Sequence, residues 1–119
     1  MTLPPFPPMA AATILLMLMP VSAKASESAL ESRCTLGTAS SCYALGDIHV
    51  QRNLSSSMRN AAKWYKKSCN LSLAKGCDAA GTMYFLSGSG GSKSEARSLF
   101  SKACSLGHSG ACGRLKRFR

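Results

Sequence analysis

The chain has 119 residues, of which 15 are basic, 5 are acidic and 6 are cysteines. This length accommodates one domain and excludes two domains of ordinary size. The net charge of +10 favours an anionic partner, namely nucleic acid, an anionic membrane surface or an acidic protein, and a solubilising surface charge is the alternative explanation.

The first 25 residues are typical of a signal peptide for export. An apolar run over residues 9–19 is followed by small residues, and cleavage after Ala23 or Ala25 fits equally well. The run is about half the ~20 residues of a membrane-spanning helix, so a retained anchor is the weaker alternative. The segment before the run departs from the pattern because it contains no Lys or Arg.

Export limits the partners of the remaining segment, residues 26–119, which carries a net charge of +9. Nucleic acid becomes the least favoured of the anionic partners in an exported protein. Six cysteines in such a short segment predict a disulfide framework formed in an oxidising compartment, either the periplasm or the exterior. The periplasm is preferred.

The cysteines also define an internal repeat. The two members of each pair are separated by seven residues, and the pairs recur every 35 residues. The copies cover residues 34–68, 69–103 and, in part, 104–119. A period in the mid-thirties is typical of helix-turn-helix solenoids. The cysteine pairs are Cys34 and Cys42, Cys69 and Cys77, and Cys104 and Cys112.

The predicted elements follow the repeat in chain order. A truncated helix around residues 28–33 comes first, and shorter helices begin near the second cysteine of each pair. Amphipathic helices follow, the first opening at Ser57 and the second at a capping box formed by Ser92 and Glu95. Segments 52–57 and 87–92 are the expected loops within the copies, and a seven-residue turn leads into each next copy.

Two matched positions carry information on packing. Gly46 aligns with Gly81, and glycine is costly inside a helix, so both predict a close approach between helices. Large apolar residues of the repeat are expected in the core. These are Trp64, Tyr65, Tyr84, Leu99 and Phe100.

Local disulfides within each copy are the predicted pairing. Helices that end near Cys69 and begin near Cys77 place both sulfurs beside one turn, and the same holds for Cys34 with Cys42 and Cys104 with Cys112. Tetrahedral zinc sites usually pair ligands over two to four residues, and redox motifs have the C-x-x-C spacing. Neither spacing occurs between cysteines of this sequence, and no cofactor or metal is expected.

The repeat resembles a known family. Ala44, Leu45 and Gly46, followed by Ala61, Trp64, Tyr65 and Lys67, are similar to the skeleton of Sel1-like repeats, which are relatives of the tetratricopeptide repeat. The cysteine spacing, and the run from Lys102 to Cys112, resemble the Helicobacter cysteine-rich proteins, often described as β-lactamase-like. The resemblance covers residues 26–119. It implies an all-α fold, a short right-handed α/α solenoid with one disulfide per repeat, and penicillin binding with weak β-lactam hydrolysis in some members.

The residues themselves offer little for such hydrolysis. Ser72 and Lys75 form the only S-x-x-K pair, which lies in a turn, and the supporting S-D-N and K-T-G elements are missing. Both are weak catalytic candidates. The histidines, His49 and His108, are interpreted as exposed or capping residues. The carboxylates within the repeat copies fall in different predicted helices without an evident pairing; they are Asp47, Asp78 and Glu95.

Binding is the better supported hypothesis, because solenoids present an extended surface to peptides or proteins. The sequence therefore predicts an interaction scaffold with a protein or peptide partner, and the alternative is the family's hydrolase role with a β-lactam or cell-wall peptide ligand. A fragment that folds only beside other repeat proteins is a third hypothesis. The weak binding candidates are Tyr43, Asn60, Lys63, Arg97 and Lys116.

The C-terminal segment combines basic and apolar side chains. It is interpreted as the polar cap of the solenoid, and contact with an anionic surface is the alternative. Its basic residues are Arg114, Lys116, Arg117 and Arg119, placed around Leu115 and Phe118.

Overall fold

The computed structural model describes residues 23–86 and 92–118, and within these ranges the chain is all-α. The proposed signal peptide therefore lies outside the described residues, apart from the start of the first helix, and so does most of the glycine-rich segment 87–92. No helix in these ranges is long and apolar enough to cross a membrane. The helices are α2 (Ala23–Thr35), α3 (Ala39–Arg52), α4 (Ser55–Asn70), α5 (Ala74–Phe85), α6 (Lys93–Ser105) and α7 (Ser109–Lys116).

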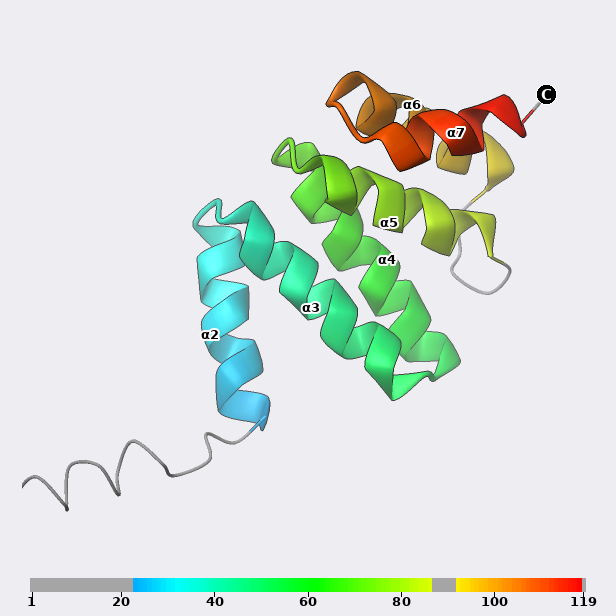
Figure 1. The fold of residues 1–119 in the computed structure, drawn as a ribbon. Coiled ribbons are helices and arrows are strands. Elements are labelled where there is room, and N and C mark those ends of the chain that lie inside the picture. Colours follow the sequence, from blue (N-terminus) through cyan, green and yellow to red (C-terminus); the bar gives the residue numbers. More distant parts are fainter. Residues whose placement is uncertain (1–22, 87–91, 119) are drawn as a thin grey trace, which may run out of the picture.

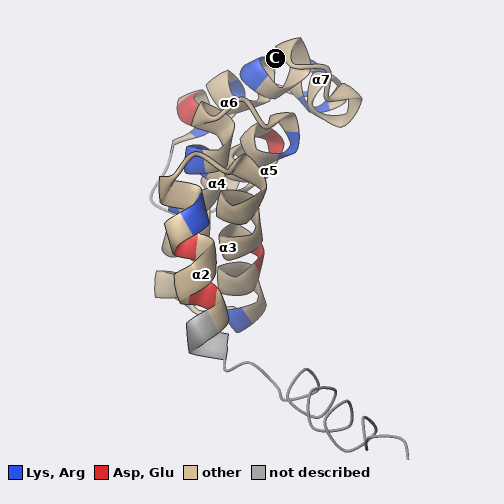
Figure 2. Cartoon of the chain, turned by 90° about the vertical axis from the view of Figure 1, so that its left-hand side faces the viewer, with Lys and Arg blue, Asp and Glu red and all other residues tan. Residues whose placement is uncertain are grey.

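The helices form two layers. From α2 to α7, each helix packs on the next one in the chain. The layer of α2, α4 and α6 lies on one side of the molecule, and the layer of α3, α5 and α7 lies on the other (Figure 1, Figure 2). Matched positions of successive copies therefore lie in the same layer.

The core between the layers is built from small side chains and a few large ones. Burial of Tyr65, Leu99 and Phe100 confirms their predicted place, whereas Trp64 and Tyr84 are half-buried and pack against the core from its edge. Small residues allow the helices to approach closely, and large ones supply most of the apolar area that stabilises the fold. The buried alanines are Ala61, Ala62, Ala80, Ala96, Ala103 and Ala111.

The matched glycines confirm the predicted close approach of helices. A Cβ atom on Gly46 would lie 2.3 Å from Cε1 of Tyr65, and one on Gly81 would lie 2.8 Å from the ring of Phe100. Gly46 and Gly81 thus each provide the space for one aromatic ring from the opposite layer. Any larger residue would force the ring out of its place.

The turns between copies are shorter than predicted and nearly identical. Only three residues lie outside the helices, for example residues 71–73 between α4 and α5. The amide of Leu73 donates to the carbonyl of Ser68, and that of Ser72 donates to Cys69, which is the Schellman pattern of a helix end. The same two bonds recur at residues 36–38 and 106–108. Because the last residue of each turn is also the N-cap of the next helix, α3, α5 and α7 begin three residues before the second cysteine, earlier than expected.

A disulfide closes each of these turns. The bonds join Cys34 to Cys42, Cys69 to Cys77 and Cys104 to Cys112, so each bond lies within one copy. The Cα atoms of the bonded cysteines are 4.4 to 4.8 Å apart. Each bond links the last turn of one helix to the first turn of the next. Three intramolecular disulfides suggest that the protein resides in an oxidising, extracytoplasmic environment.

The first copy has almost no internal loop, which corrects the sequence-based expectation for residues 52–57. Helix α3 ends at Arg52 and α4 begins at Ser55, two residues before Ser57. Asn53 adopts a left-handed conformation with φ of 53°, which asparagine tolerates better than most residues, so the chain reverses within two residues. The leading helix α2 is also longer than the predicted segment 28–33. In the second copy the capping box of Ser92 and Glu95 is confirmed.

Candidate functional site

A groove of about 530 Å³ opens where α5, α6 and α7 meet. Its walls are three phenylalanines and the side chain of Thr82, and its rim carries three cations. The combination of an aromatic surface with basic groups is suited to a ligand that is both apolar and anionic. The phenylalanines are Phe85, Phe100 and Phe118, and the cations are Lys93, Arg114 and Arg117.

The aromatic surface is held in place by its neighbours. Phe100 is buried against Gly81, and Phe118 lies 5.5 Å from Phe100, measured between ring centroids. Phe85 meets Phe118 edge to face at 5.4 Å and is half exposed. The three rings therefore form a continuous apolar surface from the core to the solvent, and the exposed part is available to a ligand.

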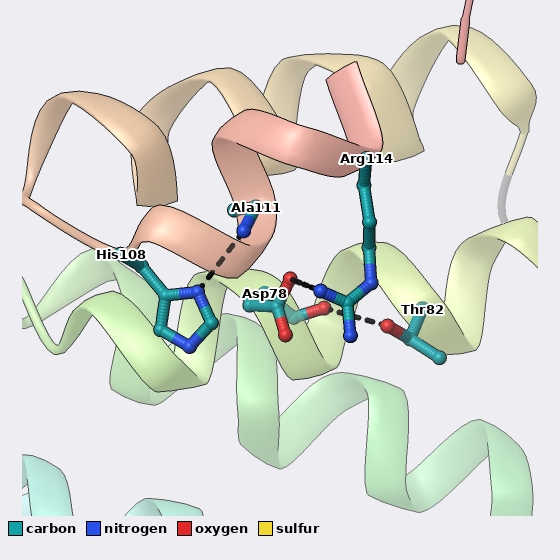
Figure 3. A network of polar contacts seen from close by, with 5 residues as sticks. All are labelled: Asp78, Thr82, His108, Ala111 and Arg114. Carbon is teal, nitrogen blue, oxygen red and sulfur yellow. Dashed lines mark hydrogen bonds and ion pairs between the residues drawn. The ribbon is translucent and has the colours of Figure 1, made fainter. Parts of the chain in front are cut away.

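A small polar network positions Arg114 at the rim (Figure 3). Its Nη1 lies 3.2 Å from Oδ1 of Asp78 on α5, in an ion pair that lacks hydrogen-bond geometry, and its guanidinium lies over the ring of Phe100. The other two cations, Lys93 and Arg117, are exposed and have no ion pair in the described residues. They are available to an external carboxylate.

His108 fixes the start of α7, the helix that carries Arg114. Its Nδ1 accepts a hydrogen bond from the amide of Ala111 at 3.1 Å, so the imidazole caps the helix (Figure 3). This confirms the predicted capping role. His49 is neither exposed nor capping, because α3 continues to Arg52; it is half-buried, and its Nδ1 has no hydrogen-bond partner in the described residues.

The corresponding surface of the preceding copy lacks the arginine and the phenylalanine that the last copy contributes to the groove. Ala79 and Met83 occupy the places of Arg114 and Phe118, and the phenol of Tyr65 donates a 2.6 Å hydrogen bond to Asp47. Burial, and then this hydrogen bond, raise the pKa of Tyr65 far above its ordinary value. The basic, aromatic groove is therefore a property of the last copy and is not imposed by the repeat.

The structure does not bring the catalytic candidates together. Ser72 is exposed in the turn after α4, and no hydrogen bond joins it to Lys75 in the described residues. The ammonium of Lys75 instead lies 4.5 Å from the ring centroid of Tyr43. Burial, followed by the charges of Asp47 and Asp78, raises the pKa of Tyr43.

Ser72 has a structural role that the sequence analysis missed. Its φ is +67°, and the matched residues in the other two turns are Gly37 and Gly107, at +101° and +98°. A left-handed conformation is strained for serine and easy for glycine. The alignment of the three copies contained this signal, since a serine stands where the other copies have glycine.

The variant Ser72→Gly is expected to raise the free energy of unfolding by about 0.5 to 1 kcal/mol, because it removes this strain. Urea denaturation followed by circular dichroism measures the change. The reverse variant Gly107→Ser should lower stability by a similar amount, and equal stability of all three proteins would contradict the role. Loss of chromogenic cephalosporin hydrolysis in Ser72→Gly would instead identify Ser72 as a nucleophile.

The predicted binding residues are dispersed over both layers. Tyr43 is half-buried on α3 and Lys116 is exposed on α7, whereas the other three are exposed on α4 and α6; they are Asn60, Lys63 and Arg97. None of the five lines the groove. No group of three His, Cys, Asp or Glu side chains that would suit a metal ion occurs in the described part of the chain.

Comparison with protein-family models and with curated proteins finds no match to this chain. The site is therefore defined by its own geometry. Sequence reasoning identified the basic C-terminal residues and Phe118, and interpreted them as a cap with contact to an anionic surface as the alternative. It did not include Phe85, because the contact of Phe85 with Phe118 depends on how α5 and α7 pack, which the repeat pattern alone does not give.

Proposed function

We propose that the chain is an exported Sel1-like repeat protein, a short α/α solenoid that binds protein or peptide partners in the groove between α5 and α7. The local disulfides and the packing of each helix on its chain neighbours support the solenoid. Such arrays present side chains from several copies on one surface. An export signal in residues 1–25, with delivery to the periplasm, accounts for the formation of the disulfides.

The chemistry of the groove carries this proposal. A partner would place an apolar side chain on Phe85 and Phe118 and a carboxylate between Lys93 and Arg117. A peptide that ends in an apolar residue has both groups next to each other. Carboxylates pair well with the planar guanidinium of arginine, which gives the interaction direction as well as charge.

Penicillin binding is the second candidate, because benzylpenicillin also carries a carboxylate and an aromatic ring. The resemblance to the Helicobacter family led to this candidate, and the groove chemistry favours binding without hydrolysis. Penicillin binding and peptide binding differ in the ligand but share the same groove. The two candidates are separated by competition in one assay.

Peptides that end in Phe or Leu with a free carboxylate are expected to bind at least tenfold more tightly than the same peptides with an amidated end. Labelled peptides from a library of C-terminal sequences, followed by fluorescence anisotropy with the oxidised protein, measure this. Phe85→Ala and Arg117→Ser should each weaken binding about tenfold, because the first removes aromatic contact area and the second removes a charge-assisted hydrogen bond.

The control is Arg97→Ser, which removes an exposed cation of α6 outside the groove and should leave binding unchanged. Equal binding of acid and amide peptides would contradict the proposal. Displacement of the peptide by benzylpenicillin, with the same sensitivity to Arg117→Ser, would support the second candidate.

A further inference from the structure

The outer face of α4 carries four exposed cations on a helix that contains no acidic residue. Together with Asn70 and Tyr84 they line a shallow concavity of about 310 Å³. This surface belongs to the layer of α2, α4 and α6, and it is separate from the groove between α5 and α7. The cations are Arg59, Lys63, Lys66 and Lys67.

Their spacing places the cations in a row. Arg59, Lys63 and Lys67 are four residues apart, so successive charges are separated by about 6 Å along the helix axis. Aromatic rings hold the lysines: Lys63 and Lys67 lie 5.6 and 5.3 Å from the ring of Trp64, and Lys66 lies 5.7 Å from the ring of Tyr84. Cation–π contacts of this kind restrict the ammonium groups without neutralising them.

The fold does not require these charges. One copy later, on α6, the positions of Arg59, Lys63 and Lys66 are taken by serines, all of them exposed. Like charges four residues apart on a helix destabilise it by a few tenths of a kcal/mol. The row on α4 is therefore unfavourable for the scaffold by itself. The serines are Ser94, Ser98 and Ser101.

The described residues do not supply counter-charges for this row. The chain has five acidic residues, and Figure 2 shows them on α2, α3, α5 and α6. Four are engaged elsewhere: Glu27 with Arg52, Asp47 with Tyr65, Asp78 with Arg114, and Glu95 in the capping box. The fifth, Glu31 on α2, forms no ion pair with α4. No acidic side chain of the described residues therefore neutralises the row.

We propose that this face of α4, called here the α4 cation row (Arg59, Lys63, Lys66 and Lys67), binds an extended acidic segment of a partner protein. Side chains on one face of an extended strand repeat every ~6.6 Å, close to the ~6 Å between successive charges of the row. Acidic residues at alternate positions therefore face successive cations. Apart from the four cations, the concavity is lined by Ala62, Asn70 and Tyr84. The inference rests on the proposed function insofar as the partner is a polypeptide.

The test uses the oxidised full chain and a labelled peptide of four Glu-Thr units, blocked at both ends so that it has no terminal carboxylate for the groove. Arg59→Ser/Lys63→Ser/Lys66→Ser copies the serines of α6 and is expected to weaken binding at least tenfold without lowering the melting temperature. The charge-matched control Arg97→Ser/Lys102→Ser/Lys116→Ser should change affinity less than twofold. A peptide of four Gln-Thr units should not bind.

Equal losses in the two triple variants would overturn the proposal, because the effect would then be one of net charge. Binding of phosphatidylglycerol vesicles or inorganic polyphosphate through the row, without binding of the Glu-Thr peptide, would overturn it in favour of another anion. The triple variant on α4 should still bind free-acid peptides in the groove, and Phe85→Ala should still bind the Glu-Thr peptide. Failure at one site is thereby distinguished from failure at the other.

Discussion

Reduction of all three disulfides is expected to unfold the protein at 25 °C. Each bond closes a loop of fewer than ten residues, and constraining the unfolded chain to that extent contributes about 2.5 kcal/mol. Three such contributions amount to about 7.5 kcal/mol, within the roughly 5 to 15 kcal/mol that a domain has in total. Helical circular dichroism with and without a reductant, at equal temperature and pH, measures the loss.

Variants that each lack one disulfide provide the control. Cys69 and Cys77 are fully buried, whereas Cys104 and Cys112 are partly exposed. Cys69→Ala/Cys77→Ala should therefore lower the free energy of unfolding more than Cys104→Ala/Cys112→Ala. The first variant loses buried packing in addition to the constraint on the unfolded chain. A reduced protein that keeps both its helical signal and its melting temperature would show that packing alone maintains the fold.

The variant Gly46→Ala is expected to lower the free energy of unfolding by about 2 to 3 kcal/mol, the upper part of the range for overpacked cores. The added methyl group would lie 2.3 Å from the ring of Tyr65, so the ring has to move. Movement of the ring also weakens the 2.6 Å bond between its hydroxyl and Asp47, which would leave a half-buried carboxylate with fewer partners. Urea denaturation measures the change.

Gly113→Ala is the matched control for Gly46→Ala. Gly113 lies inside α7, and a Cβ atom there meets nothing within 4 Å. Alanine favours a helix over glycine by up to about 1 kcal/mol, so this variant should gain stability. If both variants gained stability, the contact between Gly46 and Tyr65 would have no energetic role.

The sequence predicted those parts of the fold that repeat. The period of 35 residues indicated paired helices, the cysteine spacing indicated local disulfides, and the aligned glycines indicated the contacts of Gly46 and Gly81. The turns were predicted too long because helix propensity does not reveal that one residue, such as Leu73, both ends a Schellman motif and caps the next helix. Backbone hydrogen bonds determine the length of these turns, and the residue types alone do not predict it.

The candidate site was harder to predict for a related reason. The groove depends on residues in which the last copy differs from the preceding one, such as Arg114 in place of Ala79 and Phe118 in place of Met83. A search for repetition passes over such positions. A comparison of the copies for their differences would have found them, and it would also have found Arg59, Lys63 and Lys66 of α4, which stand where α6 has serines.

The local disulfides have a consequence for how the chain acquires its native bonds. Each cysteine pairs with the cysteine nearest to it in sequence, eight residues away. Closure of a short loop is faster and entropically cheaper than closure of a long one. The first bonds to form during oxidation are therefore expected to be the native ones. We therefore expect native oxidation without reshuffling by a disulfide isomerase, with each copy oxidising independently of the next.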